Sequence, residues 1–127
     1  MRHSTLFTVV YLLLIFISCR NSSNSTKLTG KTKRFWDVSY SPGYCYEFSR
    51  NGSCRYYYYA RTEGKAVRKL FPFDDVIVSN SWNFVNDSII DINGYKYSYK
   101  FVNDTLLKLS NIRFLSDSFT LMPSKIQ

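Results

Sequence analysis

The chain has 127 residues, of which 45% are apolar, 18% aromatic and 20% charged, as in one compact domain and unlike disordered or collagen-like chains. Lys and Arg outnumber Asp and Glu by 17 to 9, and the only histidine is His3. Removal of a leader would leave no histidine, the commonest general base and metal ligand, which disfavours most hydrolytic and metal chemistry. We therefore expect a non-enzymatic protein without catalytic residues, cofactor or metal.

Residues 1–18 have the layout of a secretory signal peptide. Arg2 and His3 give a positive start, and residues 6–17 form an almost wholly apolar run of twelve. A transmembrane helix needs about 20 apolar residues, whereas a basic start, roughly 7–15 apolar residues and a small residue are typical of a cleaved leader. The alternative is a buried core helix.

The leader ends in Phe16-Ile17-Ser18-Cys19, which resembles the lipobox of bacterial lipoproteins. The resemblance implies cleavage between Ser18 and Cys19, with a thioether-linked diacylglycerol and an amide-linked acyl chain, such as palmitate, on Cys19. Two or more acyl chains anchor a protein stably in a membrane. Arg20 is not the Asp that resembles an inner-membrane retention signal, so we expect the outer membrane, on its periplasmic face. The alternative is ordinary cleavage and free secretion.

Residues 19–33 are expected to be a lipidated, flexible tether, because residues 20–27 are small, polar and without periodicity. Lys27, Lys31, Lys33 and Arg34 follow within eight residues. Beside an anchor, such a cluster can lie against anionic head groups at about 1 kcal/mol per charge. The alternative is an ordinary solvated basic face. Residues 34–127 are expected to form the folded domain.

From residue 34 onwards apolar residues recur at every second position in short segments rich in Tyr, Phe, Val and Ile. This period is that of a half-buried strand, so the domain is predicted to be all-β. Residues 36–40 and 44–49 predict two strands joined by a turn at 41–43. Their inward faces carry Trp36, Val38, Tyr40, Tyr44, Tyr46 and Phe48.

Asn51-Gly52 predicts a hairpin whose register follows from its cross-strand partners. A two-residue turn would pair Phe48 with Arg55, whereas a three-residue loop ending on Gly52 pairs charged with charged and aromatic with aromatic residues. Each matched pair favours the second register by roughly 0.2–1 kcal/mol. It predicts the pairs Glu47 with Arg55, Tyr46 with Tyr56 and Tyr44 with Tyr58, and turns Tyr57, Tyr59 and Arg61 outwards.

Cys45 and Cys54 are a candidate disulfide, because an exported protein meets oxidising conditions. The favoured register puts them on opposite faces, and the shorter one leaves them roughly 13 Å apart, so a bridge would require a bulge. A redox pair or metal site is a weaker alternative, since Cys-x8-Cys without His fits no spacing known for either.

Residues 61–75 contain several basic residues, one Gly and one Pro, and predict a long connection with at most a short strand. The basic and aromatic mixture suits nucleic acid, but an exported protein meets little of it, so no nucleic-acid partner is expected. Asp74 and Asp75 are expected to be solvated turn residues, because neighbours on an extended chain point to opposite faces.

An internal repeat organises the second half of the chain. Residues 82–92 match residues 99–109 at a period of 17, with Phe-Val-Asn-Asp identical in both. The repeat predicts two successive hairpins of one design, each reversing at its Asn-Asp pair. Between them, Asn93-Gly94 leads into a strand over residues 95–101, and residues 112–115 and 118–122 suggest a closing strand that ends at Pro123.

These segments amount to about eight antiparallel strands, and a sheet of that size avoids exposed edges by curling into an up-and-down barrel or a strongly curled meander. Most of residues 28–123 resembles the small lipocalin-like domains of Gram-negative lipoproteins. The likeness is carried by Leu28-Thr29-Gly30 before Trp36, Tyr46-Glu47-Phe48 with Asn51-Gly52, Trp82-Asn83-Phe84, residues 95–109 and Phe119-Thr120-Leu121.

The resemblance implies a lipid-anchored envelope protein whose barrel binds a small apolar or amphipathic ligand. Inward Tyr and Trp side chains carry polar groups that need partners when buried, so they are candidates to line the cavity. These candidates are Trp36, Tyr44, Tyr46, Tyr56, Tyr58, Trp82, Tyr97 and Tyr99. A packed core is the alternative for the same residues. The alternative function is a structural or protein-interaction module, an inhibitor or assembly subunit, using the outward Tyr57, Tyr59 and basic side chains.

Overall fold

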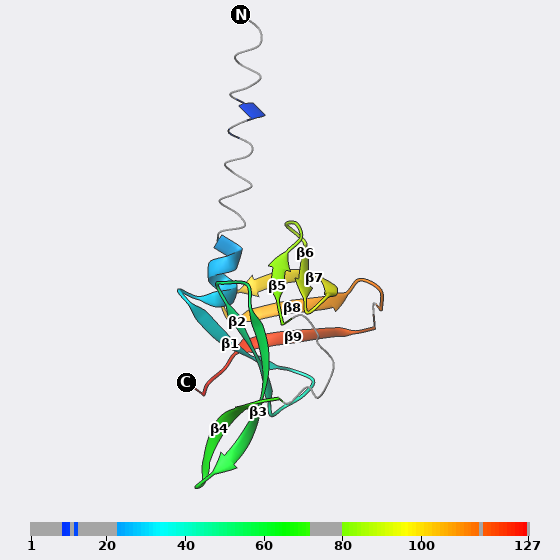
Figure 1. The fold of residues 1–127 in the computed structure, drawn as a ribbon. Helices are drawn as coiled ribbons and strands as arrows, with labels where there is room; N and C mark the ends of the chain where they lie inside the picture. Colours follow the sequence, from blue (N-terminus) through cyan, green and yellow to red (C-terminus); the bar gives the residue numbers. More distant parts are fainter. Residues whose placement is uncertain (1–8, 11, 13–22, 72–79, 115, 127) are drawn as a thin grey trace, which may run out of the picture.

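A computed structural model describes residues 9–10, 12, 23–71, 80–114 and 116–126. They include a short helix over residues 23–29 and one antiparallel sheet of nine strands in the order β4-β3-β2-β1-β9-β8-β7-β6-β5 (Figure 1). No helix among the described residues is long and apolar enough to span a bilayer. The strands are β1 (Lys33–Val38), β2 (Tyr44–Ser49), β3 (Cys54–Thr62), β4 (Lys65–Leu70), β5 (Trp82–Phe84), β6 (Ile89–Ile92), β7 (Tyr95–Asn103), β8 (Leu106–Asn111) and β9 (Ser118–Pro123).

The last strand, β9, joins the two halves of the sheet. It pairs with β1 through Val38 and Leu121, and with β8 through Leu107 and the same Leu121. We call strands β1 to β4 the first arm and strands β5 to β8 the second arm. Because each arm is a meander of neighbouring hairpins, β9 is the element that makes them one sheet.

The prediction of a closed barrel is wrong, because the sheet is open between the β3–β4 hairpin and β5. Among the described residues, an isolated bridge between Ser53 and Ser81 joins the two edges. Hydrogen bonds of 3.0 Å support it, from the Trp82 amide to the Gly52 carbonyl and from the Cys54 amide to the Asn80 carbonyl. The far half of β3 pairs with β4, and β5 has three residues. The bridge places β5 opposite the β2–β3 turn and not opposite β3. The β3–β4 hairpin extends away from the body of the sheet (Figure 1).

Strand β4 falls where the sequence suggested a long connection. Glu63 and Gly64 both have positive φ, 52° and 76°, and make the two-residue turn that a tight hairpin requires. Its residues show no clean alternation because most of β4 is exposed rather than set against a core. Residues 72–79, which include Asp74 and Asp75, lie outside the described residues.

The β2–β3 register is confirmed. Glu47 pairs with Arg55, Tyr46 with Tyr56 and Tyr44 with Tyr58. The turn is held by the Asn51 side chain, whose oxygen accepts the Ser53 amide at 3.0 Å, and by Gly52 at a φ of 89°.

The 17-residue repeat is also confirmed as two hairpins of one design. Phe84 pairs with Ile90 across the first hairpin, and the equivalent Phe101 pairs with Leu107 across the second. In each turn the Asn side-chain oxygen accepts the backbone N–H two residues further on, at 2.9 Å and 2.8 Å. Identical residues therefore make identical local hydrogen bonds in both turns.

Residues 23–29, expected within a flexible tether, are instead helical and belong to the domain. Leu28 is fully buried, and its carbonyl accepts the Trp36 indole N–H at 2.8 Å. Asn24 donates to the Tyr99 hydroxyl at 3.1 Å, so the helix also contacts β7. A helix this short is not stable alone, and its contacts with the sheet explain why local composition did not predict it.

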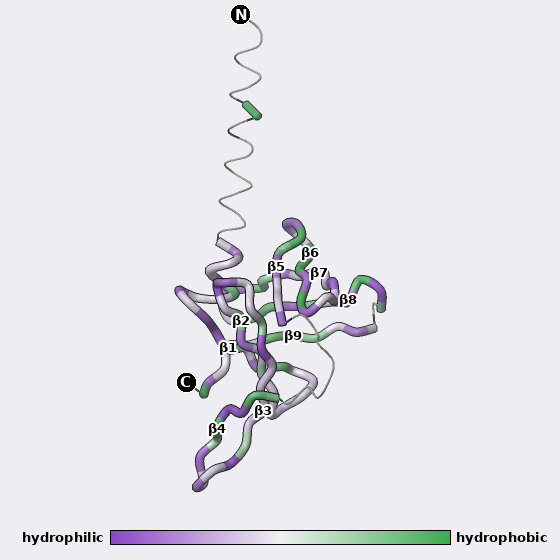
Figure 2. Tube along the Cα trace, viewed as in Figure 1, coloured by the Kyte–Doolittle hydropathy of each residue, from purple (hydrophilic) through white to green (hydrophobic). Residues whose placement is uncertain are grey.

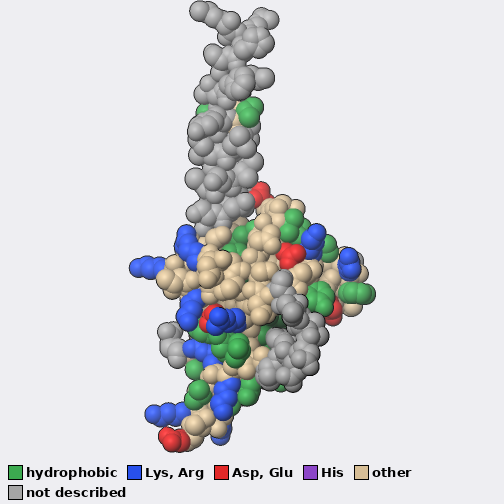
Figure 3. Space-filling model, in the orientation of Figure 1, with side chains coloured by type: hydrophobic (Ala, Val, Ile, Leu, Met, Phe, Trp, Pro, Cys, Tyr) green, Lys and Arg blue, Asp and Glu red, His purple; other side chains and the backbone are tan. Residues whose placement is uncertain are grey.

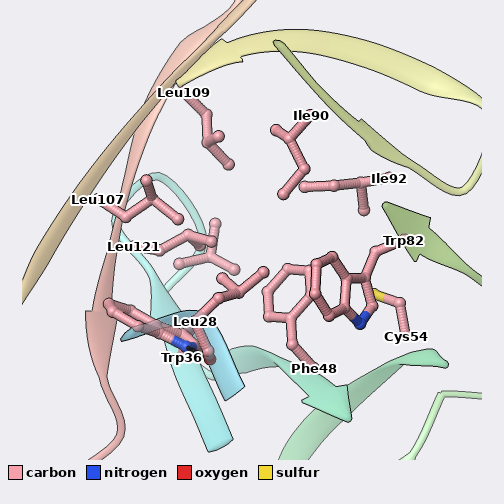
Figure 4. Close-up of a cluster of buried hydrophobic side chains, with 11 residues drawn as sticks. Leu28, Trp36, Phe48, Cys54, Trp82, Ile90, Ile92, Leu107, Leu109 and Leu121 are labelled. Carbon is pink, nitrogen blue, oxygen red and sulfur yellow. Dashed lines mark hydrogen bonds between the residues drawn. The ribbon is translucent and has the colours of Figure 1, made fainter. Parts of the chain in front are cut away.

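The core lies between the two arms. Figure 4 shows side chains from the helix, both arms and β9 pointing towards one another, and Figure 2 shows hydrophilic residues at the tips of the hairpins. Two bulky members, Trp36 and Phe48, come from the first arm. The cluster consists of Leu28, Trp36, Val38, Phe48, Cys54, Trp82, Ile90, Ile92, Leu107, Leu109 and Leu121.

Candidate functional site

An open cavity of about 310 Å³ lies over the inner face of β2 and β3, and five tyrosines line it. Three of them, Tyr46, Tyr56 and Tyr97, are among the residues that the sequence suggested. We call this site the tyrosine cavity. Its described lining consists of Tyr40, Tyr46, Tyr56, Asn80, Ile92, Asn93, Tyr95 and Tyr97.

The tyrosine cavity and the helix lie at opposite ends of the strands. Tyr40 follows the end of β1, and Tyr95 begins β7. The helix instead precedes the start of β1 and contacts Tyr99 and Phe101, further along β7. The helix therefore covers one end of the core, and the cavity opens at the other.

Sequence reasoning placed Tyr40 among the inward tyrosines but missed Tyr95 as a lining residue, and each of the two side chains is 61% exposed. Tyr40 lies beyond the last residue of β1, and Tyr95 joins Asn93 around the turn from β6 to β7. Alternation identifies the face of a strand, but it does not show which strand ends approach one another. No pattern in the sequence could have grouped these two side chains.

Two tryptophans proposed as cavity lining are instead packed in the core. Trp36 is fully buried, and Trp82 is 8% exposed. The Trp82 indole donates to the Ser49 carbonyl at 2.8 Å, and its ring lies edge-on to Phe48 with centroids 6.2 Å apart. The alternative of a packed core therefore holds for both tryptophans.

Three of the proposed tyrosines are outside the described cavity lining. Tyr44 stacks on Tyr56 at a centroid distance of 5.5 Å, and Tyr58 lies edge-on to Phe71 at 6.3 Å. Tyr99 lies 4.9 Å from Phe84, near the helix. Tyr44 therefore supports a ring that lines the cavity, whereas Tyr99 closes the opposite end of the core.

A second hollow, of about 410 Å³, adjoins the tyrosine cavity and shares Tyr40 and Tyr97 with it. Phe119 lies edge-on to both shared rings, at 5.2 Å from Tyr40 and 5.6 Å from Tyr97. Asp117 places a carboxylate in this second hollow. The three aromatic rings thus form a ridge between the tyrosine cavity and a hollow that contains a carboxylate.

The described lining of the tyrosine cavity is uncharged at neutral pH. Burial raises the pKa of Tyr46 above the usual range for a tyrosine and raises the pKa of Tyr56 to about 12. Burial also raises the pKa of Tyr40 and of Tyr97. The hydroxyls therefore stay protonated and can both donate and accept hydrogen bonds, and no Lys, Arg, Asp or Glu is among the described lining residues.

We expect the protein to lose stability between pH 10 and pH 12. In the unfolded chain Tyr56 ionises near pH 10, whereas in the folded chain its pKa is about 12. Over that interval the unfolded state releases the proton first, so rising pH favours unfolding. Urea midpoints measured from pH 9 to pH 12 should fall, and the decrease should be smaller in Tyr56→Phe. A urea midpoint that stays constant up to pH 12 would contradict the raised pKa of Tyr56.

The outward tyrosines bond to the protein's own carboxylates. Tyr57 donates to Glu47 at 3.2 Å, while the Tyr59 hydroxyl lies 2.5 Å from an Asp37 oxygen and 2.6 Å from the Ser124 hydroxyl. These two rings are half-buried and therefore do not form the exposed aromatic patch that a protein-interaction surface would offer.

Cys45 and Cys54, the candidate disulfide, are both free thiols in the structure. Cys45 pairs with Tyr57 on the outer face, whereas Cys54 pairs with Phe48 on the core face. The sheet therefore lies between the two sulfurs. Burial raises the pKa of each thiol, so both stay protonated and weakly nucleophilic at neutral pH. Among the described residues, no three His, Cys, Asp or Glu side chains gather as a metal site would require.

The comparisons with known proteins found no relative of this chain. No family model matches the chain, and no curated protein or solved structure matches it. The fold itself defines the class: an all-β protein with one antiparallel meander of nine strands. Ser18 and Cys19, the expected cleavage and lipidation site, lie outside the described residues.

Proposed function

We propose that this protein is a non-enzymatic, lipid-anchored protein of the bacterial outer membrane, on its periplasmic face, that binds a small uncharged ligand in the tyrosine cavity. The observation that carries the proposal is the cavity of about 310 Å³ walled by five tyrosines. Ligand sites are typically clefts of roughly 300–1,000 Å³ with apolar walls and a few polar groups.

The chemistry of the lining selects the class of ligand. Aromatic rings and Ile92 offer apolar faces, while the tyrosine hydroxyls and the amides of Asn80 and Asn93 supply hydrogen-bond donors and acceptors. A charged ligand would lose hydration without gaining a partner charge from these residues. The ligand is therefore a neutral apolar or amphipathic molecule.

The leader supports the location. The lipobox-like residues 16–19 overlap the end of an apolar run that is too short to span a bilayer. Helical residue 23 is only four positions beyond Cys19, so an anchor there would attach the helix end of the domain. The tyrosine cavity, at the other end of the strands, would then face the aqueous phase.

Binding can be tested with an uncharged aromatic dye, N-phenyl-1-naphthylamine, titrated into the full chain in one detergent throughout. Tyr40→Ala and Tyr95→Ala are each expected to weaken dye binding by about fivefold or more, because truncating an aromatic contact residue costs on the order of 1 kcal/mol or more. Phe114→Ala is the matched control, since Phe114 is similarly exposed at 62% and lies outside the cavity. Equal affinities in all three variants and the parent chain would refute the site.

The anchor can be tested by measuring the intact mass of protein extracted from membranes in detergent. We expect the mass of residues 19–127 plus acyl groups, and we expect Cys19→Ala to lose both the acyl mass and the cleavage, because the modified thiol is the signal for processing. The same spectrum would carry any tightly bound ligand. An unmodified, freely soluble chain would refute the anchor and leave the cavity proposal to be judged on dye binding.

A further inference from the structure

The second hollow, of about 410 Å³, is bordered by three aromatic rings and one carboxylate. Two of the rings, Tyr40 and Tyr97, also line the tyrosine cavity, whereas Phe119 and Asp117 are outside the described lining of that cavity. The neutral ligand proposed for the tyrosine cavity gives no role to this carboxylate. The second hollow therefore has a chemistry of its own.

The carboxylate and the rings lie on the same face of the sheet. Phe119 and the core residue Leu121 are two positions apart on β9, so they point to one face. Asp117 directly precedes β9, and the Asn111 amide donates to its carbonyl at 2.9 Å, which continues the β8–β9 pairing. By the same alternation the Asp117 side chain points to the face of Phe119.

Backbone hydrogen bonds hold Tyr40 beside Phe119. The Ser39 amide donates to the Thr120 carbonyl at 3.0 Å, and the Thr120 amide donates to the Ser39 hydroxyl at 3.0 Å. The rings of Tyr40 and Tyr97 are inclined to the Phe119 ring by 81° and 83°. Two rings nearly perpendicular to a third form a corner, and a group in that corner contacts more than one ring.

Both parts of this lining attract positive charge. The faces of aromatic rings are negative, and the charge of Asp117 reaches both tyrosines, since burial chiefly raises the pKa of Tyr40 and of Tyr97 and this carboxylate adds to both increases. Among the described residues, no Lys or Arg side chain forms an ion pair with Asp117. The negative charge in the hollow is therefore not neutralised by the protein.

The rest of the protein repels cations. Figure 3 shows many Lys and Arg side chains and few Asp or Glu on one face of the molecule, and the chain has 17 basic residues against 9 acidic ones. A cation can therefore bind only where local contacts outweigh the net charge. The second hollow offers such contacts from three rings and a carboxylate.

We propose that the second hollow binds an organic ammonium group, with Tyr40, Tyr97 and Phe119 as an aromatic cage and Asp117 as the counter-charge. Aromatic cages bind methylated ammonium groups because the ring faces attract the charge and the methyl groups pack against the rings. A hard metal ion would instead need roughly six oxygen ligands, which one carboxylate does not supply. This inference adds a second site, and it rests neither on the lipid anchor nor on the neutral ligand of the tyrosine cavity.

The test compares choline with 3,3-dimethylbutan-1-ol, which has the same shape but no charge. Each is titrated into the full chain in a maltoside detergent at pH 7, and backbone amide NMR shifts give the Kd and the location. We expect choline to bind at least about fivefold more tightly, because each exposed cation–ring contact is worth roughly two- to fivefold in affinity. The largest shifts should fall on residues 116–119.

Two variants separate the carboxylate from the rings. Asp117→Asn should weaken choline binding by roughly two- to fivefold, the range of an exposed ion pair, and leave the alcohol unchanged. Asp104→Asn is the matched control, since Asp104 is exposed and precedes β8, whereas Asp117 is bonded to the last residue of that strand. Phe119→Leu retains apolar volume without a ring face, so it should weaken choline more than the alcohol.

Phosphocholine distinguishes the two sources of such a group. A lipid head group carries a phosphate near its ammonium, whereas a free ammonium compound does not. Binding of phosphocholine at least as tight as that of choline would identify the ligand as a head group. Weaker binding would identify a free ammonium compound, because the phosphate would then be repelled by Asp117.

The possible failures are distinct from those of the tyrosine cavity. Equal affinities for choline and the alcohol would overturn the ammonium site, as would equal choline binding by Asp117→Asn and the parent chain, or shifts centred outside residues 116–119. The naphthylamine dye should bind Asp117→Asn as it binds the parent, since Asp117 is outside the described lining of the tyrosine cavity. Choline binding without dye binding would refute the neutral-ligand site and leave the ammonium site standing.

Discussion

Replacing Trp36 by alanine is expected to lower the free energy of unfolding by about 3–5 kcal/mol, the range typical of a buried aromatic truncated to alanine. Trp36 is fully buried, and its indole N–H bonds the Leu28 carbonyl at 2.8 Å. The substitution removes the ring that fills the core beneath the helix and the hydrogen bond that holds the helix. Urea denaturation followed by circular dichroism would measure the loss.

The conservative variant separates packing from hydrogen bonding. Trp36→Phe retains most of the apolar contact but leaves the Leu28 carbonyl without its indole donor, so we expect a loss of about 1–3 kcal/mol. Early proteolysis within residues 23–29 should then appear in both variants, because release of the helix needs only the lost contact. Equal stability of Trp36→Ala and the parent chain would contradict the packing described for this residue.

Leu121→Ala is expected to destabilise the protein by about 2–5 kcal/mol. Leu121 is fully buried on β9, where it pairs with Val38 of the first arm and Leu107 of the second. A cavity at this position weakens the one strand that pairs with both arms. Because the core draws on both arms, we expect a single cooperative transition that shifts to lower urea concentration.

The neighbouring residue is the matched control. Met122 is 46% exposed on the opposite face of the same strand, and Met122→Ala should change the stability by less than about 1 kcal/mol. If the two variants were equally stable, β9 would not join the arms through Leu121. Separate transitions of the two arms in Leu121→Ala would show instead that β9 is needed for cooperativity.

Local patterns predicted the elements whose partners are near in sequence. The pairing of Glu47 with Arg55 follows from the loop length at Gly52, since one register alone matches charge with charge and ring with ring. The equivalent pairs Phe84 with Ile90 and Phe101 with Leu107 follow from the repeat. In both cases the deciding interactions lie within one hairpin, so the sequence contains all of the information.

The site was predicted only in part, because its lining residues come from more than one hairpin. Alternation identified Tyr46, Tyr56 and Tyr97 as inward residues, and they do line the cavity. Alternation does not distinguish an inward residue that lines a cavity from one packed in the core, as Trp36 is. That distinction depends on how far apart the two arms stand, and this distance is set by all the side chains between them.

The amino-acid sequence by itself determined an all-β domain, the order of its hairpins and the register of the β2–β3 hairpin, because short-range alternation and turn chemistry decide these features. Only the tertiary structure decided three others. The helix at residues 23–29 exists because Leu28 enters the core. β4 is a strand because it pairs with the edge of β3 that β2 leaves free. The sheet stays open because β5 lies opposite the β2–β3 turn and not opposite β3. The helix and the open sheet depend on contacts between residues distant in the chain, whose free energy no local pattern contains, whereas β4 forms a local hairpin whose exposed residues lack alternation.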